Sequence, residues 1–449
     1  MIQTTCVPPV RQAALVRAVG RWSLIALVVN CIVGSGVFGL PSVVAALVGR
    51  ASLIAVPIAG AAIAVIIACF AEVASQFTQT GGTYLYVRAA FGSCAGIQVG
   101  WFNLLGRLTA AAAGANLFVI YLGALWPPAA LAITRFLILT LLVGILAAVN
   151  YRGVRAGTLV SNVFVAAKLS ALGAVCAVGV FYLIAANRVI PPPTPPASAG
   201  NWLKAVLVLF FAYGGFEAAL TPMREAKDPR RNVAFALFVA FITVGVIYIL
   251  IQWVVVGVLP DPAHSDRPLA DAMQILMGRG GAILIAIGAL ISVCGYLSAI
   301  VLAGPRTAFA LAERGDFPLW FAAVHPKFRT PHISILVFAT LVWLLALSGS
   351  FAWNVTLSAA ARLFYYGMTC SALPLLRRKQ SAASFRVPGG PALAVLGVTI
   401  CVVLMTAVDF SKILILAATS SIAFVNWLFV RRVGSASPTL DSLESEEPS

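Results

Sequence analysis

Long apolar stretches separated by short polar segments run through almost the whole chain. A stretch of about 20 residues with few charges is long enough to cross the hydrocarbon core of a bilayer as a helix. About twelve such spans are predicted, at residues 22–48, 52–77, 95–125, 134–150, 157–186, 202–223, 233–258, 281–303, 333–349, 353–376, 391–409 and 411–430. The pattern therefore predicts an all-α polytopic membrane protein.

Glycine residues interrupt two of these spans. The first span contains Ile32-Val33-Gly34-Ser35-Gly36, and the sixth contains Tyr213-Gly214-Gly215-Phe216-Glu217. Glycine weakens a helix and lets a ligand approach the backbone, and unpaired backbone at membrane depth is tolerated only where it is buried in protein or lines a cavity. Interrupted spans at corresponding places in two halves of a chain indicate the binding site of a secondary transporter.

The broken spans open two halves of five spans each. Because five is an odd number, the halves have opposite orientations, which predicts a five-plus-five inverted repeat with broken helices 1 and 6. The expected parts are a cytoplasmic N-terminus (1–21), a first repeat (22–186), an external linker (187–201), a second repeat (202–376), two further spans (377–430) and a cytoplasmic tail (431–449). Prolines at 191–193, 195 and 196 make the linker stiff, and the polar, acidic tail is expected to be disordered.

The composition agrees with a membrane protein. Of the 449 residues, 61% are hydrophobic and 10% are charged, and the mean hydropathy is +0.99, whereas soluble domains have about 25% charged residues. The net charge of +16 does not indicate nucleic-acid binding, because the basic residues follow the positive-inside rule if the N-terminus is cytoplasmic. We therefore expect a multi-pass protein of the cytoplasmic (inner) membrane, surrounded by lipid, with both termini in the cytoplasm.

The chain lacks the sequence patterns of an enzyme or a metal protein. Its eight cysteines are scattered without CxxC spacing, and no HExxH or GxSxG motif occurs. The three histidines, His264, His325 and His332, fall in predicted loops. A membrane-embedded enzyme needs a nucleophile with a base, or a metal cluster, so we expect no catalysis, no bound metal and no cofactor.

Several short motifs occur in a characteristic order. They are Gly34-Ser35-Gly36-Val37-Phe38-Gly39-Leu40-Pro41, Phe70-Ala71-Glu72-Val73-Ala74-Ser75, Thr80-Gly81-Gly82-Thr83-Tyr84, residues 210–217, Asp228-Pro229-Arg230-Arg231-Asn232-Val233, Arg306-Thr307 with Asp316-Phe317-Pro318, and Phe385-Arg386-Val387-Pro388. Together they resemble the amino acid/polyamine/organocation (APC) superfamily of transporters, in particular its bacterial amino acid permeases. The resemblance covers roughly residues 20–430, and the combination of motifs is specific.

The resemblance implies the LeuT-like inverted-repeat fold, with alternating access to a site at mid-membrane. In that family the unwound first span holds the substrate's α-carboxylate through backbone N–H groups, and carbonyls at the sixth-span break accept its α-ammonium. The matching substrate-binding residues here are Ile32, Gly34, Ser35, Gly36, Phe211, Tyr213, Gly214, Phe216 and Glu217. N–H groups at the start of a half-helix are also a ready anion site on physical grounds. The alternative is that the glycines only permit close helix packing.

Lys168 lies near the middle of the fifth span. A charge at the bilayer centre costs about 2.5–3.5 kcal/mol on insertion scales, so the residue needs a partner or a function. Proton-coupled members of the resembled family carry a lysine at a similar place, where its ammonium occupies the position of a sodium ion in sodium-coupled relatives. Because a buried lysine gives up its proton more easily, we predict that Lys168 couples transport to protons; the alternative is a permanently charged strut.

Three more charged residues fall inside predicted spans near the expected site. Glu217, in the sixth-span break, either accepts the N–H groups that the break frees, relays a proton, or contacts a cationic substrate. Arg107 and Arg362 are predicted to neutralise Glu217 or to pair with one another. If Arg107 instead faces the cavity, it favours anionic groups and argues against a strictly cationic substrate. Tyr296 in the eighth span is a candidate for lining the pathway.

These features predict a secondary active transporter of amino acids, with an amino acid and protons as its small-molecule partners. Proton symport is the first hypothesis because of Lys168, and exchange of amino acids, or of amino acids and polyamines, is the alternative. Sodium coupling is third, since Lys168 would repel a cation at the matching site. A sensor that kept the transporter fold without turnover is a further alternative, and it would bind substrate without accumulating it.

Overall fold

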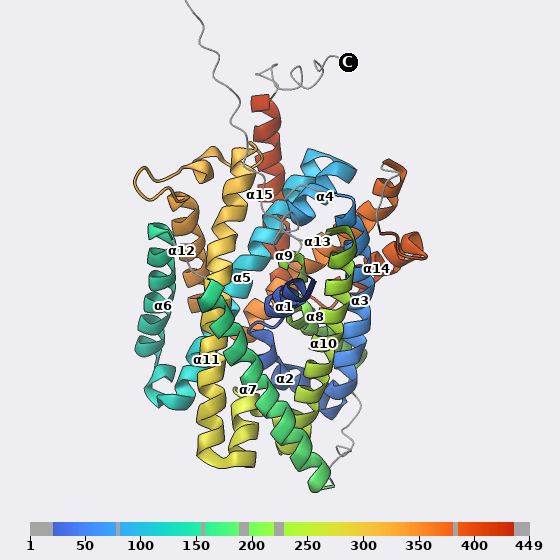
Figure 1. Cartoon of the computed structure of the whole chain (residues 1–449). Coiled ribbons are helices and arrows are strands. Elements are labelled where there is room, and N and C mark those ends of the chain that lie inside the picture. Colours follow the sequence, from blue (N-terminus) through green and yellow to red (C-terminus); the bar gives the residue numbers. More distant parts are fainter. Residues whose placement is uncertain are drawn as a thin grey trace, which may run out of the picture.

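The structure is a computed structural model that describes residues 21–77, 81–153, 158–187, 197–219, 229–379 and 385–434. These ranges are helical, with short connections and no strand (Figure 1). The N-terminus before residue 21, the proline-rich residues 191–196 and the tail after residue 434 lie outside the described residues. The all-α fold expected from the hydrophobic pattern is therefore confirmed.

The helices follow the predicted spans. They are α1 (Arg21–Ile32), α2 (Gly36–Val48), α3 (Ser52–Ser75), α4 (Gly82–Phe91), α5 (Ser93–Leu125), α6 (Ala132–Arg152), α7 (Thr158–Ala185), α8 (Ala199–Tyr213), α9 (Phe216–Ala219), α10 (Pro229–Val258), α11 (Pro268–Glu313), α12 (His332–Ser348), α13 (Phe351–Lys379), α14 (Gly390–Met405) and α15 (Phe410–Gly434). Each predicted span coincides with one of these helices or with a pair of them, and α4 is an additional short helix.

In the part of the chain that the structure describes, seven helical segments are long and apolar enough to cross a membrane by themselves. The other predicted spans miss this criterion for visible reasons. Helices α8, α12 and α14 are short, the first and sixth spans are each split in two, and α13 contains a buried arginine and ends in three basic residues. Splits and internal charges are the features that we expect around a transport site.

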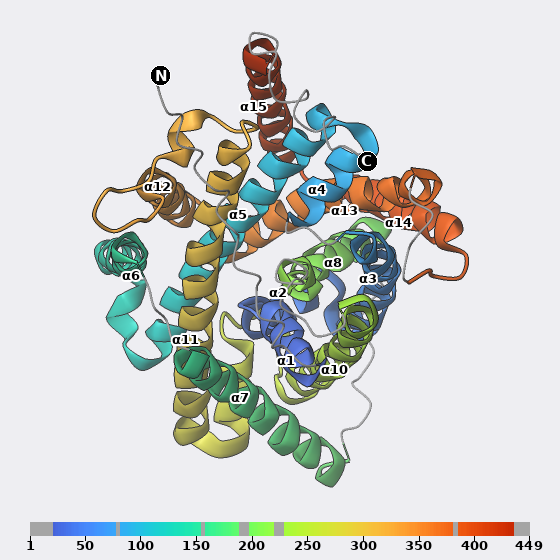
Figure 2. The ribbon, with the colours of Figure 1, turned by 45° about the horizontal axis from the view of Figure 1, so that its top comes forward.

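The helices form two groups that run side by side (Figures 1 and 2). One group contains α1, α2, α3, α8 and α10, in which α10 contacts α1 and α3, and α8 contacts α2 and α3. The other contains α5, α6, α11 and α12, with α13 packed against α5 and α7 packed against α11. Each group therefore contains helices from both halves of the chain.

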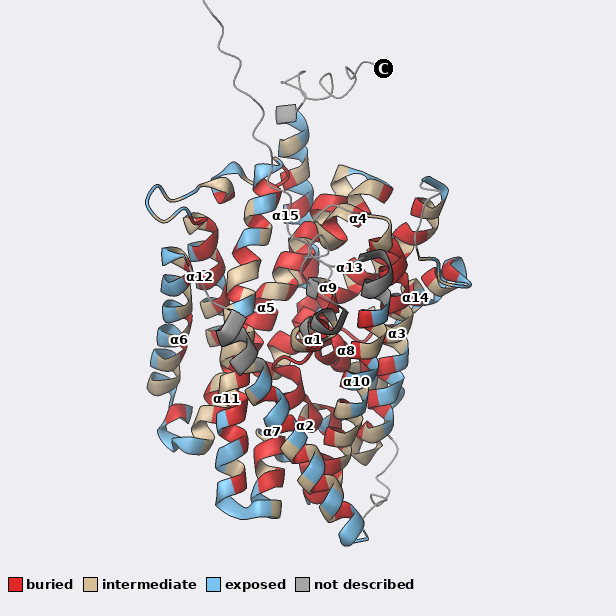
Figure 3. Cartoon of the chain, viewed as in Figure 1, coloured by how far each residue is buried: buried red, intermediate tan, exposed pale blue. Residues whose placement is uncertain are grey.

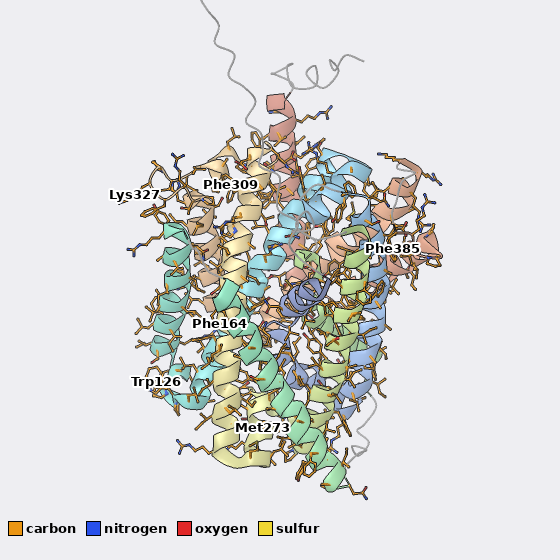
Figure 4. All side chains as sticks on the ribbon, in the orientation of Figure 1. Trp126, Phe164, Met273, Phe309, Lys327 and Phe385 are labelled. Atoms are coloured by element: carbon orange, nitrogen blue, oxygen red, sulfur yellow. The ribbon has the colours of Figure 1, made fainter. Side chains whose placement is uncertain are left out.

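The two ends of the molecule differ in the elements they carry. The α4 face, at the top of Figure 1, carries α4, the α11–α12 connection and the C-terminal end of α15, and Lys327 lies on it (Figure 4). The opposite face carries the connection between α5 and α6, where Trp126 lies. Between the faces, α6 exposes a row of apolar side chains that includes Leu137 and Leu141 (Figure 3). Such a large exposed apolar surface suits contact with lipid.

Candidate functional site

The two helix breaks meet in the middle of the molecule. The first break separates Ile32 at the end of α1 from Gly36 at the start of α2, and the second separates Tyr213 of α8 from Phe216 of α9. Gly215, in the second break, has φ +108°, and a Cβ on it would lie 2.3 Å from the carbonyl oxygen of Cys31. Only glycine permits both this conformation and this approach, so the breaks contact each other through bare backbone.

A cavity of about 280 Å³ lies where the breaks meet. It brings together most of the predicted site residues: Ile32, Gly34, Ser35, Gly36, Arg107, Lys168, Phe211, Gly214, Glu217, Tyr296 and Arg362. These residues come from eight different helices and from both breaks. Tertiary packing therefore gathers into one place residues that sequence reasoning had selected for separate reasons.

Tyr213 and Phe216 do not line this cavity. The Tyr213 hydroxyl donates to the Val56 carbonyl at 3.3 Å, and its ring packs against Tyr248, with ring centroids 5.2 Å apart. Phe216 packs edge-on against Phe70, with centroids 5.2 Å apart. Of the predicted aromatic residues around the second break, only Phe211 reaches the cavity wall in the described part of the chain.

Other lining residues had no signal in the sequence. Asn30 of α1 and Tyr365 of α13 line the cavity because of how these helices are rotated about their axes, and packing against neighbouring helices fixes that rotation. Phe164 lies in the first third of α7, where α7 meets α11 (Figure 4), and a Cβ on Gly295 of α11 would lie 2.8 Å from the Phe164 ring. An aromatic residue within an apolar span looks like any lipid-facing or core residue, so only the structure identifies these three.

The cavity continues toward the α4 face. A second hollow of about 410 Å³ shares Arg107, Glu217 and Ala303 with the first cavity and extends to Tyr84 of α4 and Arg314 at the end of α11. The other direction is tightly packed. A Cβ on Gly36 would lie 3.1 Å from the Cα of Ala212, and beyond it the space lined by α2, α3, α8 and α10 shrinks to about 20 Å³. In this conformation the site opens to the α4 face.

Glu217 is held by a dense set of donors. Its Oε1 accepts from Arg362 at 2.8 Å and from the Tyr365 hydroxyl at 3.0 Å. Its Oε2 accepts from the Tyr366 hydroxyl at 3.0 Å and from the backbone N–H of Gly215 at 2.8 Å. The carboxylate therefore binds an N–H that the break frees and neutralises Arg362, whose side chain is only 8% exposed. Together these contacts connect the second break to α13.

Lys168 reaches the first break from α7. Its ammonium donates to the side-chain oxygen of Asn30 at 2.9 Å, to the backbone carbonyl of Asn30 at 3.4 Å and to the carbonyl of Val33. The residue is 2% exposed, and none of the ion pairs among the described residues includes it. Lys168 thus satisfies carbonyls that the end of α1 leaves without helical partners.

Arg107 lines both hollows from α5. Within the described ranges, its guanidinium makes one hydrogen bond, from Nε to the Asn103 side-chain oxygen at 2.8 Å, and no ion pair. The predicted pairing of the two arginines is therefore not found there, and the neutralisation of Glu217 falls to Arg362 alone. Because Glu217 already accepts four hydrogen bonds, it has little capacity left for Arg107.

Tyr248 of α10 was not singled out by its sequence, yet it touches both breaks. Its hydroxyl lies 3.0 Å from the carbonyl oxygen of Ala212 and 3.4 Å from that of Ile32. One hydroxyl proton can serve only one acceptor well at a time, so Tyr248 is shared between the ends of α1 and α8. A single tyrosine in a long apolar span carries no sequence signal for this position.

At the α4 face, Asp316 ties the end of α11 to α4. Its carboxylate accepts from the Tyr84 hydroxyl and from Arg88. Burial raises the pKa of Asp316 to about 6, and the opposing effect of Arg88 is weakened because its side chain is 39% exposed to screening solvent. Since Tyr84 also lines the hollow that leads to the site, this cluster borders the entrance.

The fold and the site define a multi-pass membrane protein of the transporter class, with a cavity built on two broken helices. The amino acid permease family profile matches residues 19–430 of the sequence. The chain therefore belongs to the amino acid permease family, within the APC superfamily that the motifs resemble.

Curated relatives match nearly the whole chain at low identity. A methylthioribose transporter of Bacillus subtilis is 28% identical over 94% of this chain and 93% of its own length. A serine/threonine exchanger of the same organism is 26% identical over 86% and 89%, respectively. Cationic amino acid transporter 4 of Mus musculus is 27% identical over 86% of this chain and 63% of its own length. The substrates named for these relatives differ widely, so family membership alone does not define the cargo.

Proposed function

We propose that this protein is a secondary active transporter of amino acids that works by alternating access and is driven by proton symport. The observation that carries the proposal is the cavity at the contact between the two helix breaks. Gly34, Ser35 and Gly36 line it at the start of α2, where the first N–H groups of a helix have no partner within the helix and attract an anion such as the α-carboxylate. Carbonyls of the breaks would accept the α-ammonium.

The hydrogen bonds of Lys168 support proton coupling. A protonated lysine has three N–H donors, and Lys168 directs them at three acceptors, which are two oxygens of Asn30 and the carbonyl of Val33. A neutral amine has only two donors, so loss of the proton weakens the link between α7 and the end of α1. In this scheme, binding and release of the proton change how firmly α1 is held and thereby bias the switch between conformations.

We further propose that the α4 face is the cytoplasmic one, which makes this conformation the inward-open state. Basic residues lie at that end of the molecule, in line with the positive-inside rule: Lys327 is on the α4 face (Figure 4), Arg314 lines the hollow toward it, and Arg377 pairs with Glu72 near the end of α3. The tail after residue 434 then lies in the cytoplasm. We also propose that the N-terminus, which precedes α1, is cytoplasmic. The same proposal divides the chain into two inverted repeats joined by an external linker at 187–201.

Uptake of a panel of labelled amino acids into proteoliposomes tests the function. We expect accumulation driven by an inward proton gradient in vesicles without internal amino acid. Uptake only into preloaded vesicles would instead make the protein an exchanger, which is the activity that the serine/threonine relative is named for. Saturable binding without uptake in either condition would indicate a sensor, and neither binding nor uptake of any amino acid would contradict the proposal.

Lys168→Met tests the coupling. We expect the variant to lose gradient-driven accumulation, with the uphill ratio falling to about that without a gradient, because the ammonium that binds three acceptors is removed. Lys204→Met is the matched control, since Lys204 is an exposed lysine on α8 that pairs with Asp409 away from the cavity. Proton-driven accumulation that survives in Lys168→Met would exclude Lys168 from the coupling mechanism.

A further inference from the structure

The charged groups that line the site and its exit are mostly cations. Arg107, Lys168 and Arg362 line the cavity, and Arg306 and Arg314 line the hollow toward the α4 face. Among the described lining residues, Glu217 is the only carboxylate in either hollow. The path from the site to the α4 face therefore carries an excess of positive charge. Clefts lined by one sign of charge concentrate solutes of the opposite sign.

Of the three cations that line the inner cavity, Arg107 differs from the other two in how few of its N–H donors are already used. Arg362 is neutralised by Glu217 at 2.8 Å, and Lys168 directs its donors at backbone and amide oxygens of the first break. Arg107 uses only its Nε, toward Asn103, within the described residues. The two terminal nitrogens of Arg107 are thus left to bind a group inside the cavity, and they have the planar geometry that binds a carboxylate with two parallel hydrogen bonds.

Arg107 also lies at a different place from the anion site at the start of α2. It belongs to α5, in the second group of helices, and lines both hollows, whereas Ser35 and Gly36 line only the inner cavity. A ligand with one carboxylate at α2 still leaves the Arg107 guanidinium unpaired in a partly buried wall, which costs free energy. A ligand with a second acidic group pairs with both.

From this charge distribution, we infer that the preferred substrate is an amino acid with an acidic side chain and that Arg107 is the residue that selects for it. The inference rests on the proposed function and narrows it to a substrate class. Cationic amino acids are disfavoured, because their side chains would meet like charge at Arg107 and along the exit.

Direct binding to the purified full-length protein tests the inference. The probes are L-glutamate, L-alanine and L-arginine, measured by isothermal titration calorimetry in one buffer at one ionic strength. We expect L-glutamate to bind at least ~10-fold more tightly than the other two, as a charge-assisted pair of hydrogen bonds implies. Equal or tighter binding of L-alanine or L-arginine would overturn the inference while leaving amino acid transport intact.

Substitutions at position 107 then test the residue. In Arg107→Gln, the ratio of the L-glutamate affinity to the L-alanine affinity should fall by at least ~10-fold, and Arg107→Lys should recover part of it, because charge returns without the planar pair of donors. Arg279→Gln, which removes an exposed cation near the opposite face, should leave the ratio as in the wild type. An unchanged ratio in folded Arg107→Gln would refute the role of Arg107.

The outcomes separate the two proposals. If a broad panel shows neither binding nor proteoliposome uptake of any amino acid, the proposed function and the substrate class fail together. If neutral amino acids bind and accumulate without a preference for acidic ones, only the substrate class fails. Thermal melting of each variant shows whether it is folded, so a lost affinity is not confused with a lost structure.

Discussion

The two helix breaks have the same form but satisfy their backbone in different ways. At the second break, Glu217 accepts from Arg362, two tyrosine hydroxyls and the Gly215 N–H, so opposite charges are paired inside the protein. At the first break, the charged partner is Lys168, a lone cation that donates to carbonyl and amide oxygens. Among the described residues, the second break has a paired charge, whereas the cation at the first break has no anionic partner.

This difference supports the proposal that the second break stabilises the fold and that the first break binds the ligand. A buried ion pair with all its hydrogen bonds made resists change, because removing either partner strands a charge. Lys168 can release and rebind its proton, and the first N–H groups of α2 have capacity for an incoming carboxylate. We therefore expect substitutions at the second break to affect mainly stability, and substitutions at the first break to affect mainly transport.

The largest expected effect is at the second break. Glu217→Gln leaves the buried charge of Arg362 without its counter-charge, which should cost about 3–5 kcal/mol of stability. The measurement is the melting temperature of the purified protein in detergent. The double variant Glu217→Gln/Arg362→Gln should recover a large part of the loss, because no unpaired charge remains. A single variant as stable as the wild type would show that the ion pair does not hold this break.

Glycine substitutions compare the two breaks directly. Gly215→Ala requires a side chain at φ +108° with its Cβ 2.3 Å from the Cys31 carbonyl oxygen, so we expect about 2–3 kcal/mol of destabilisation. Gly34→Ala places its Cβ 2.8 Å from the edge of the Tyr296 ring, and a ring yields more easily than backbone. Gly34→Ala should therefore melt closer to the wild type but lose uptake, because it narrows the cavity. Similar melting temperatures for both variants would contradict the distinction.

Tyr248 links the two breaks, so its hydroxyl sharpens the comparison. Tyr248→Phe removes the donor from the Ala212 and Ile32 carbonyls while keeping the ring. We expect a loss of about 1–2 kcal/mol, because a buried acceptor loses its partner. Combining Tyr248→Phe with Glu217→Gln in a double-mutant cycle measures whether the breaks are energetically coupled. Strict additivity of the two losses would mean that they are independent.

The smallest effect is expected for the exposed ion pair between Lys204 and Asp409. Lys204 belongs to α8, the helix that ends at the second break. Hydrogen bonds from Lys412 and then Lys204 lower the pKa of Asp409, which lies between α14 and α15. A carboxyl whose pKa is lower in the folded than in the unfolded state stabilises the folded state at pH values above its unfolded pKa. This stabilisation is lost as the pH falls through its folded pKa. Because Asp409 and Lys204 are each 45% exposed and Asp409 keeps its contact with Lys412, Lys204→Met should cost less than about 1 kcal/mol at pH 7.

Melting curves at low and high salt, and between pH 3 and pH 7, measure this last effect. The difference between Lys204→Met and the wild type should shrink at the acidic end of this range, where Asp409 loses its charge, and it should also shrink in high salt. A difference as large as that of Glu217→Gln would remove the contrast between buried and exposed pairs on this helix.

Much of the architecture followed from local properties of the sequence. The length of an apolar stretch determines whether it can cross a bilayer, so the spans were found without knowledge of their neighbours. Glycine weakens a helix whatever its neighbours are, so Gly34 and Gly215 made it possible to predict the positions of the breaks from the sequence. Lys168 was recognisable because a charge in the middle of an apolar span needs a partner or a function.

Tertiary structure decided which groups meet. Glu217 and Arg362 lie far apart in the sequence and are joined only because α13 packs beside the second break. The side chains of Tyr213 and Phe216 do not line the cavity, because the rotation of a helix depends on its neighbours and not on its own residues. The sequence by itself therefore determined the spans, the breaks and the charges, whereas packing across the two halves determined that one break is neutralised and the other is left open to a ligand.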